Sequence, residues 1–297
     1  MTQTADIGID VAHNMIPTNG INLHVAQAGS VDGELVILLH GFPEFWYGWR
    51  SQIGFLAEHG CRVWAPDQRG YNLSDKPQGI AAYKVSTLAA DIVGLIDAAG
   101  REQAVIVGHD WGAAVAWHLA IHHADRVKKL AILNVPHPQV MNQTLRTSPE
   151  QMLKSWYMGY FQLPLLPEGM FLFGEGNLAA LTLTATSRPG TFTDRDIPHY
   201  LQAWKQPVTA TAMINWYRAL LRYTPDMEGE QRVTMPALII WGAKDAFLSS
   251  SMAQRSIEKC DHGRLVMIDQ ATHWVQHEEA ERVNALLLEH IQGDHHQ

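Results

Sequence analysis

The chain has 297 residues, of which 46% are hydrophobic and 18% charged, and 22 basic against 30 acidic residues give a formal net charge of −8. This composition is that of a globular protein large enough for one domain with an insertion, and its acidic balance disfavours nucleic acid and anionic membranes as partners. Cys61 and Cys260 lie far apart, no apolar run approaches the roughly 20 residues that cross a bilayer, and residues 1–10 lack the pattern of a secretory signal. We therefore expect a cytoplasmic protein without membrane span, metal ion or cofactor, in which the tail with His295 and His296 is a frayed end.

The first part of the chain alternates short apolar runs with segments of helical periodicity. Within residues 84–99, for example, Val85, Leu88 and Ile92 recur at the spacing of one helix face. Such alternation is typical of crossover units, in which helices join parallel strands. We predict strands at residues 21–26, 35–39, 62–65, 104–107 and 130–133, and helices at residues 84–99 and 113–122.

The alternation stops near Pro136 and resumes at about residue 230. The segment between is dense in aromatic residues, Leu, Met and Pro and has no convincing strand, which predicts a helical insertion. After it, the pattern predicts strands at residues 237–241 and 264–268 and helices at residues 251–259 and 278–290. The expected architecture is an α/β core domain of residues 1–137 and 230–297, built on a mostly parallel sheet, and a helical cap domain of residues 138–229.

The strongest local motif is Gly108-His109-Asp110-Trp111-Gly112, between a predicted strand and a predicted helix. This is the setting of a nucleophile elbow, the G-x-S-x-G turn that exposes its middle residue at a helix N-terminus. Here the middle residue is Asp110, whose carboxylate is ionised near neutral pH and can attack a saturated carbon to form an ester. The alternative is that Asp110 only caps the helix.

A second motif, His40-Gly41-Phe42-Pro43, directly follows a predicted strand. In enzymes with a nucleophile elbow, this loop supplies one backbone N–H of an oxyanion hole, and the residue after the nucleophile supplies the other. The two amides would be those of Phe42 and Trp111. The alternative is a plain turn, and the sequence does not decide whether the Phe42-Pro43 bond is cis.

An ester at Asp110 needs a base that activates water for its hydrolysis. Among 16 histidines, His273 is the best candidate, because it lies in a loop between a predicted strand and the last predicted helix. Asp245, just past the predicted strand at 237–241, is its natural orienting acid. The chain order of nucleophile, acid and histidine is the one that accompanies the elbow.

Two tyrosines in the predicted insertion, Tyr157 and Tyr217, lie in aromatic segments at helical spacing. Phenols are neutral donors at pH 7 and could both bind one substrate oxygen, as the opening of an epoxide ring requires. The alternative is that they belong to the hydrophobic core, which is the usual place of aromatic residues at this spacing.

Together these motifs resemble the α/β-hydrolase-fold epoxide hydrolases of the soluble and bacterial type. The resemblance covers nearly the whole chain and implies a helical lid inserted after the sixth strand. It also implies that Asp110 opens an epoxide, that Tyr157 and Tyr217 bind its oxygen, and that Phe42 and Trp111 contribute to substrate binding. The abundance of Trp, Phe, Leu and Met in the insertion suggests that this epoxide is apolar and aromatic. Tyr160 is the neighbour that could be confused with Tyr157. The matching segments are residues 40–44, 67–74, 108–112, 157–162 and 215–218, with Asp245 and His273.

Two alternatives to an epoxide hydrolase stay open. Haloalkane dehalogenases share the Asp nucleophile, but Phe42 stands where many of them carry Asn, and the arginines of fluoroacetate dehalogenases are replaced by Trp111 and Ala114. A non-catalytic binding protein on the same scaffold is less favoured, because no expected catalytic residue is missing. The sequence does not decide which epoxide is the substrate or whether the chain forms a homodimer.

Overall fold

The computed structural model describes residues 9–224 and 229–293. Residues 1–8, which belong to the segment predicted to lack a secretory signal, lie outside the described residues, as does the tail with His295 and His296. No helix in the described ranges is both long and apolar enough to cross a membrane.

Eight strands form one sheet in the order β1-β2-β4-β3-β5-β6-β7-β8. The first two pairings, β1 with β2 and β2 with β4, are antiparallel, and all the others are parallel. The central strands read as continuous apolar runs because helices cover both faces of the sheet. The strands are β1 (Ala12–Thr18), β2 (Ile21–Ala28), β3 (Glu34–Leu39), β4 (Cys61–Pro66), β5 (Ala104–His109), β6 (Val127–Leu133), β7 (Val233–Gly242) and β8 (Cys260–Ile268).

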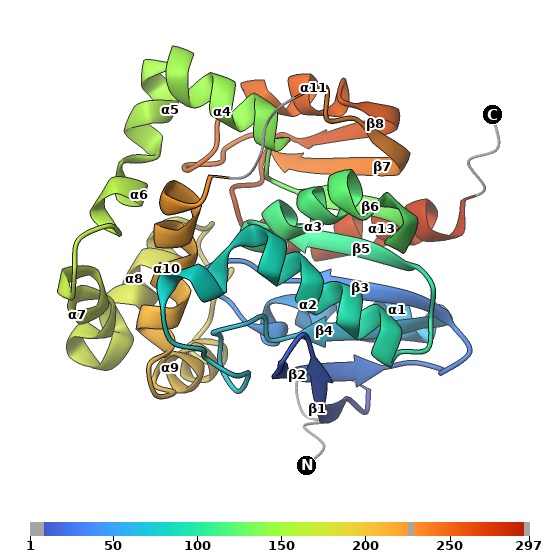
Figure 1. The fold of residues 1–297 in the computed structure, drawn as a ribbon, viewed down its shortest axis with the longest axis horizontal. Coiled ribbons are helices and arrows are strands. Elements are labelled where there is room, and N and C mark those ends of the chain that lie inside the picture. The colour runs from blue at the N-terminus through green and yellow to red at the C-terminus, as the bar shows by residue number, and fades with distance from the viewer. Residues whose placement is uncertain (1–8, 225–228, 294–297) are drawn as a thin grey trace.

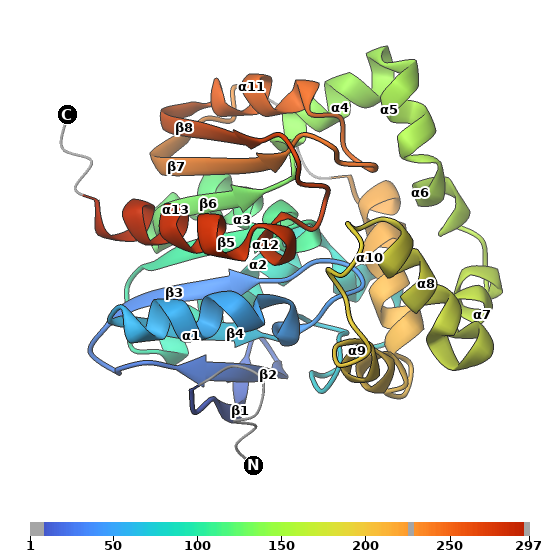
Figure 2. The ribbon, with the colours of Figure 1, turned by 180° about the vertical axis from the view of Figure 1, so that it is seen from behind.

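Helices lie on the two faces of this sheet, with α2 and α3 on the side that Figure 1 shows and α1 and α13 on the opposite side (Figure 2). Helix α3 is apolar around most of its circumference because it is packed between the sheet and α2. Short 3-10 turns complete the core at Trp46–Trp49, Ile80–Tyr83 and Ala124–Arg126. The core helices are α1 (Arg50–Glu58), α2 (Val85–Ala98), α3 (Trp111–His122), α11 (Ser251–Ile257), α12 (Val275–Glu278) and α13 (Ala280–Gln292).

The chain between β6 and β7 is a helical insertion. It lies beyond the carboxyl ends of the central strands, to the left in Figure 1. Two buried indoles bind it to the core: Trp204 Nε1 donates to the Pro43 carbonyl at 2.6 Å, and Trp216 Nε1 donates to the Arg69 carbonyl at 3.0 Å. Its helices are α4 (Pro138–Thr147), α5 (Pro149–Lys154), α6 (Trp156–Tyr160), α7 (Leu166–Leu172), α8 (Asn177–Ala185), α9 (Ile197–Trp204) and α10 (Thr209–Arg222), with a 3-10 turn at Phe173–Gly176.

The mostly parallel sheet and the helical insertion after the sixth strand are confirmed, and the main differences from the sequence analysis lie at the edges of the sheet. Strand β1 was not predicted, because it pairs on one side only and its side chains are largely exposed. Strand β8 begins four residues before the predicted strand, because its first half is also solvent-exposed and polar. Helix α1 was not predicted, and the last predicted helix is interrupted at Glu279.

Candidate active site

Asp110 lies at the sharp turn between β5 and α3, where its backbone adopts φ 49° and ψ −122°. This conformation is costly for a residue with a side chain and persists only where the surrounding structure imposes it. The glycines on either side make the turn possible. A Cβ on Gly108 would collide with the backbone of Gly112 and Ala113, and a Cβ on Gly112 would collide with the carbonyl of Leu39. The turn therefore holds the Asp110 carboxylate above the carboxyl ends of the strands.

One oxygen of this carboxylate is already bound by the loop after β3. The Phe42 amide donates to Asp110 Oδ1 at 2.6 Å, and the adjacent Gly41 leaves no room for a side chain beside that carboxyl group. The hydrogen bonds of the described residues include none from the Trp111 amide to the carboxylate. Trp111 is, however, the first residue of α3, where a backbone N–H has no acceptor within the helix. The Phe42-Pro43 peptide bond is cis.

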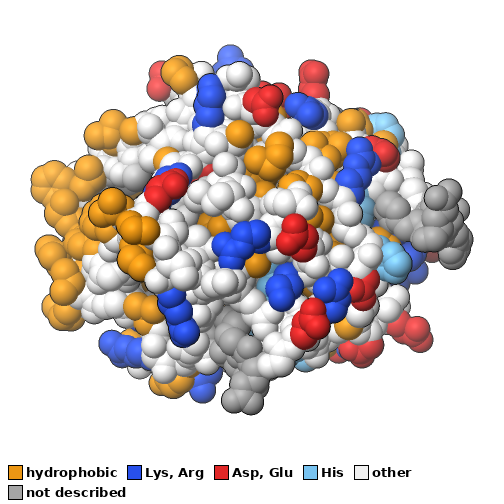
Figure 3. Space-filling model, turned by 90° about the horizontal axis from the view of Figure 1, so that it is seen from above, with side chains coloured by type: hydrophobic (Ala, Val, Ile, Leu, Met, Phe, Trp, Pro, Cys, Tyr) orange, Lys and Arg blue, Asp and Glu red, His pale blue; other side chains and the backbone are white. Residues whose placement is uncertain are grey.

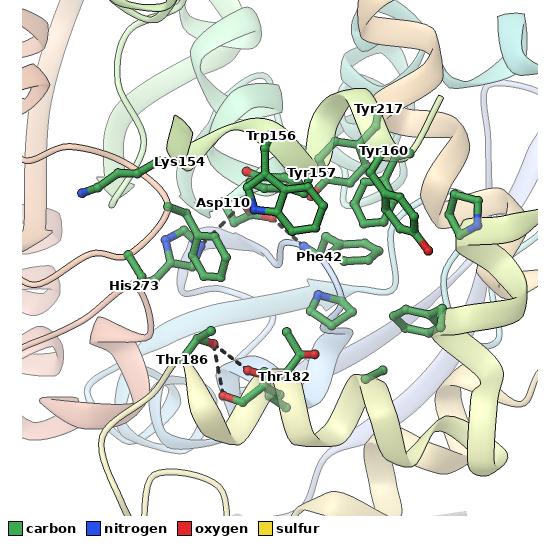
Figure 4. A pocket seen from close by; sticks show the side chains of 18 of the residues that line it. Phe42, Asp110, Lys154, Trp156, Tyr157, Tyr160, Thr182, Thr186, Tyr217 and His273 are labelled. Carbon is green, nitrogen blue, oxygen red and sulfur yellow. Dashed lines mark hydrogen bonds and ion pairs between the residues drawn. The ribbon is translucent and has the colours of Figure 1, made fainter. Parts of the chain in front are cut away.

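His273 and Asp245 come from the loops after β8 and β7 and meet beside the nucleophile. His273 Nδ1 lies 2.8 Å from Asp245 Oδ2. His273 Nε2 lies 3.6 Å from Asp110 Oδ2, and Figure 4 shows these two side chains next to each other. The other Asp245 oxygen, Oδ1, accepts from the amides of Phe247 and Leu248 at 2.7 and 2.9 Å. The imidazole is thus held with one nitrogen on an acid and the other facing the elbow, as in a nucleophile–histidine–acid triad.

The charges around His273 favour its protonated form. Burial alone would lower the pKa of this histidine, but the carboxylates of Asp245 and Asp110 outweigh burial and raise the pKa to about 10. Burial likewise favours a neutral Asp245, yet His273 and the hydrogen bond from Asn134 hold the pKa of Asp245 below its usual value. The site therefore carries an imidazolium between two carboxylates before any substrate reacts.

Tyr157 of α6 and Tyr217 of α10 face Asp110 from the insertion, with their ring centroids 5.9 Å apart and the rings nearly perpendicular. Burial, and next the charge of Asp110, raise the pKa of both phenols, so each is a neutral hydrogen-bond donor over the whole physiological range. Tyr160 also lines the cavity, but in Figure 4 its side chain extends away from Asp110. The structure therefore brings Tyr157 and Tyr217 to the nucleophile, and not Tyr160.

A cavity of about 750 Å³ lies above Asp110 and between the core and the insertion. Aromatic rings form its inner wall, with Phe42 packed edge-on against Tyr217 at 5.4 Å and close to Phe161 at 5.4 Å. Its rim includes Leu153 and Trp156, which are 75% and 68% exposed, so the cavity reaches the surface there. Figure 3 shows many hydrophobic side chains at the left of the molecule, where the insertion lies. Such a cavity accepts an apolar molecule.

The sequence analysis did not single out Asn134, which directly follows β6 and is fully buried. Its side-chain amide donates to Asp245 Oδ2 at 2.8 Å, and its side-chain oxygen accepts from the Gly242 amide at 3.0 Å. Asn134 thus binds both Gly242 at the end of β7 and Asp245 in the loop that follows it. A polar residue at the carboxyl end of a parallel strand, next to the elbow strand, is the signal that could have identified it.

His109, which precedes the nucleophile, and Glu44, at the end of the second motif, form a buried polar cluster below the site. His109 Nε2 lies 2.8 Å from the His273 carbonyl oxygen, and Glu44 accepts from Tyr200 at 2.7 Å and lies 2.8 Å from His277 Nε2. The His273 loop is therefore supported from beneath. In the described ranges, no group of three or more His, Cys, Asp or Glu side chains is arranged to hold a metal ion.

The sequence of residues 34–280 matches the family model for the alpha/beta hydrolase fold. The chain belongs to the α/β hydrolase fold family. It is 49% identical to the AB hydrolase superfamily protein YfhM of Bacillus subtilis, across 94% of this chain and 97% of that protein. It is 36% identical to Epoxide hydrolase A of Mycobacterium tuberculosis, across 94% and 97% of the two chains.

Two solved structures of epoxide hydrolases are similar to this member of the family. That of Epoxide Hydrolase A from Mycobacterium thermoresistibile superposes with a TM-score of 0.87 at 33% identity, covering 95% of this chain and 98% of the other. The Bacillus megaterium epoxide hydrolase, in complex with an inhibitor, gives a TM-score of 0.87 at 31% identity and covers 94% and 99%. The resemblance inferred from the motifs is thereby confirmed, and with it the prediction of a hydrolase.

Proposed function

We propose that this hydrolase converts an apolar epoxide to a vicinal diol through a covalent ester at Asp110. The observation that carries the proposal is the pair of neutral phenols, Tyr157 and Tyr217, that face the carboxylate across an apolar cavity. An epoxide oxygen becomes strongly basic as its ring opens, so two hydrogen-bond donors that stay protonated stabilise that change. The name of Epoxide hydrolase A and the titles of the two similar structures support the same activity.

In the first step, Asp110 Oδ2 is the attacking atom, because Oδ1 is bound by the Phe42 amide while Oδ2 faces His273. A bond forms between Oδ2 and one epoxide carbon, and the bond from that carbon to the ring oxygen breaks. The ring oxygen takes a proton from one tyrosine, leaving a hydroxyalkyl ester and a tyrosinate. The N-terminus of α3 and the Phe42 amide keep the carboxylate in place.

Ester formation removes the negative charge of Asp110 that had raised the pKa of His273. His273 then loses its proton to solvent and, now neutral, accepts a proton from the attacking water, whose hydroxide adds to the ester carbonyl carbon. The oxygen that becomes negative lies at the Phe42 amide, and the Trp111 amide is the second donor of this oxyanion hole. The expelled alcohol oxygen takes the proton from His273, the proton of the re-formed acid returns to the tyrosinate, and His273 regains a proton from solvent as the diol leaves.

The test is a set of epoxides and haloalkanes assayed side by side with the wild type, Asp110→Ala and His273→Gln. We expect diol formation by the wild type, none by Asp110→Ala, and in His273→Gln a protein mass increased by the mass of one epoxide. Halide release without diol formation would select a dehalogenase instead, and binding without turnover would select a non-catalytic protein. Full activity of Asp110→Ala would contradict the scheme altogether.

A further inference from the structure

Helix α5 of the insertion lies against the loop that carries Asp245 and binds three of its backbone groups. Lys154 Nζ donates to the Asp245 carbonyl at 3.1 Å. Gln151 Nε2 donates to the Phe247 carbonyl at 2.8 Å, and Gln151 Oε1 accepts from the Ser249 amide at 2.9 Å. Because this loop follows β7 whereas α5 belongs to the insertion, Asp245 is joined to the part of the chain that carries the two tyrosines.

Gln151 also reaches the helix that carries Tyr157. Its side chain is fully buried, and Nε2 donates a second hydrogen bond, to Ser155 Oγ at 2.9 Å. Ser155 directly precedes α6, in which Tyr157 is the second residue. Both N–H groups and the oxygen of the Gln151 amide are therefore bonded, and a buried polar group with its bonds made keeps a single orientation. One side chain thus contacts the Asp245 loop on one side and the start of the Tyr157 helix on the other.

Phe247 makes a parallel connection through its ring. Its backbone N–H donates to Asp245 Oδ1 at 2.7 Å, and its carbonyl accepts from Gln151. Its ring stands edge-on to two others, at 5.9 Å from Tyr157 and 5.1 Å from His273 between ring centroids. A displacement of Phe247 would therefore disturb the phenol and the imidazole together.

The two steps of the proposed reaction use groups from both sides of this contact. Tyr157 of the insertion donates to the epoxide oxygen in the first step, and His273, held by Asp245, activates water in the second. Both groups act at Asp110, so each must stay within hydrogen-bond reach of the same small volume. A displacement of about 1 Å can slow such a step by about a hundredfold.

We propose that Gln151 is a positioning residue for both steps, because it fixes the distance between Tyr157 and the pair of Asp245 and His273. This role presupposes the proposed epoxide hydrolase function and adds a residue to it. Gln151 is not among the described residues that line the cavity above Asp110, so it acts through the groups that it holds. Its loss should slow ester formation and ester hydrolysis together, although the two steps use different catalytic groups.

Gln151→Met tests this role, since methionine has a similar length and makes none of the three hydrogen bonds. Styrene oxide is the probe, and rapid-quench mass measurements in a single turnover give the rate constants of ester formation and of ester hydrolysis. We expect both rate constants to fall about tenfold. Because KM depends on substrate binding and on the ratio of the two rate constants, kcat should fall by the same factor at an unchanged KM. A variant in which either step keeps the wild-type rate constant would overturn the proposal.

The matched control is Gln52→Met. Gln52 is a fully buried glutamine of α1 that donates to the Gln276 carbonyl at 3.1 Å and to Asn284 Oδ1 at 2.9 Å. Both variants lose the hydrogen bonds of a buried amide, but Gln52→Met should keep the wild-type rate constants. A loss of folded protein alone lowers the amount of ester formed per mole of chain and leaves the rate constants as they are. Equal slowing in Gln52→Met would show a general effect of stability and would overturn the proposal.

Two further variants separate the contacts of Gln151. Ser155→Ala removes only the bond toward Tyr157 and should slow ester formation about threefold without a change in hydrolysis. In Tyr157→Phe, addition of Gln151→Met should slow hydrolysis about tenfold and leave ester formation nearly unchanged, because no hydroxyl remains there to be misplaced. Independent losses in both steps of the double variant would overturn the proposal. If Gln151→Met does not fold, Ser155→Ala decides alone, and any other pattern in it would overturn the proposal.

These outcomes are distinct from a failure of the proposed function. A wild type that converts styrene oxide through an ester, with both rate constants unchanged in Gln151→Met, would overturn the role of Gln151 and leave the epoxide hydrolase intact. A wild type that forms neither ester nor diol, from styrene oxide or from any other epoxide, would overturn the proposed function itself.

Discussion

The side-chain amide of Asn134 donates a hydrogen bond of 2.8 Å to Oδ2 of Asp245, the same oxygen that lies 2.8 Å from His273 Nδ1. Asn134 is fully buried and adopts a positive φ of 57°, so its position is imposed by the fold. The acid of the site is thus held between two neighbours from different loops. An acid fixed in this way keeps the imidazole in one tautomer and one orientation.

Removal of the Asn134 amide should therefore slow the step that needs His273 as a base. We expect Asn134→Ala to lower the rate of ester hydrolysis by about tenfold to a hundredfold, as for other buried partners that orient a catalytic group. Formation of the ester should change little, since Asp110 does not contact Asn134. Rapid-quench mass measurements of ester formation and decay check this. Asn134→Asp is a second variant for the same measurement, in which another carboxylate faces Asp245. Equal slowing of both steps would show that Asn134 is only structural.

The raised pKa of His273 predicts different pH profiles for the two chemical steps. Ester formation uses the Asp110 carboxylate and should be nearly flat between about pH 7 and 9, because His273 stays protonated below its pKa of about 10. Hydrolysis needs neutral His273, so its rate should rise with pH. The inflection should lie below pH 10, because the ester lacks the Asp110 charge that raises the pKa of His273 in the free enzyme. Single-turnover rates over this range check the prediction. A hydrolysis rate that falls with rising pH would contradict the role of His273 as base.

The two tyrosines should act together on the first step. Replacement of either hydroxyl in Tyr157→Phe or Tyr217→Phe should lower the rate of ester formation by about tenfold to a hundredfold, and the double variant should lose nearly all activity. The rings keep their packing, so the melting temperature should change little. Tyr160→Phe is the matched control, because Tyr160 extends away from Asp110. An unchanged rate in the double variant would show that the phenols do not bind the epoxide oxygen.

The sequence predicted those parts of the site that are local in the chain. The elbow at Asp110 needs only small residues on both sides and a strand-to-helix transition, and all of these are visible as five consecutive letters. His273 and Asp245 follow strands of a parallel sheet, whose carboxyl ends must meet at one edge. Tyr157 and Tyr160 are alike in spacing and type, and the resemblance to a family had to separate them.

The parts that sequence analysis did not find depend on partners far away in the chain. Asn134 is one polar residue after a strand, and its importance comes from Asp245, more than a hundred residues later. A cavity of about 360 Å³ next to Tyr157 and Tyr217 is lined by residues of α3, α4 and α10, and no single stretch of sequence shows that these helices meet there. Strand β1 was not found because an edge strand with exposed side chains lacks the apolar pattern of its buried neighbours.

The hydrogen bond between Tyr200 and Glu44 joins the insertion to the loop that supplies the Phe42 amide. Tyr200 lies on α9 with no exposed surface, and its hydroxyl donates to Glu44 Oε1 at 2.7 Å. Tyr200→Phe should lower the free energy of unfolding by about 1 to 3 kcal/mol, since one acceptor of a buried carboxylate loses its donor. The exposed Tyr223→Phe is the control, and denaturant unfolding measures both. An unfolding free energy equal to that of the wild type would mean that Gln276 and His277, which also contact Glu44, are sufficient to satisfy it.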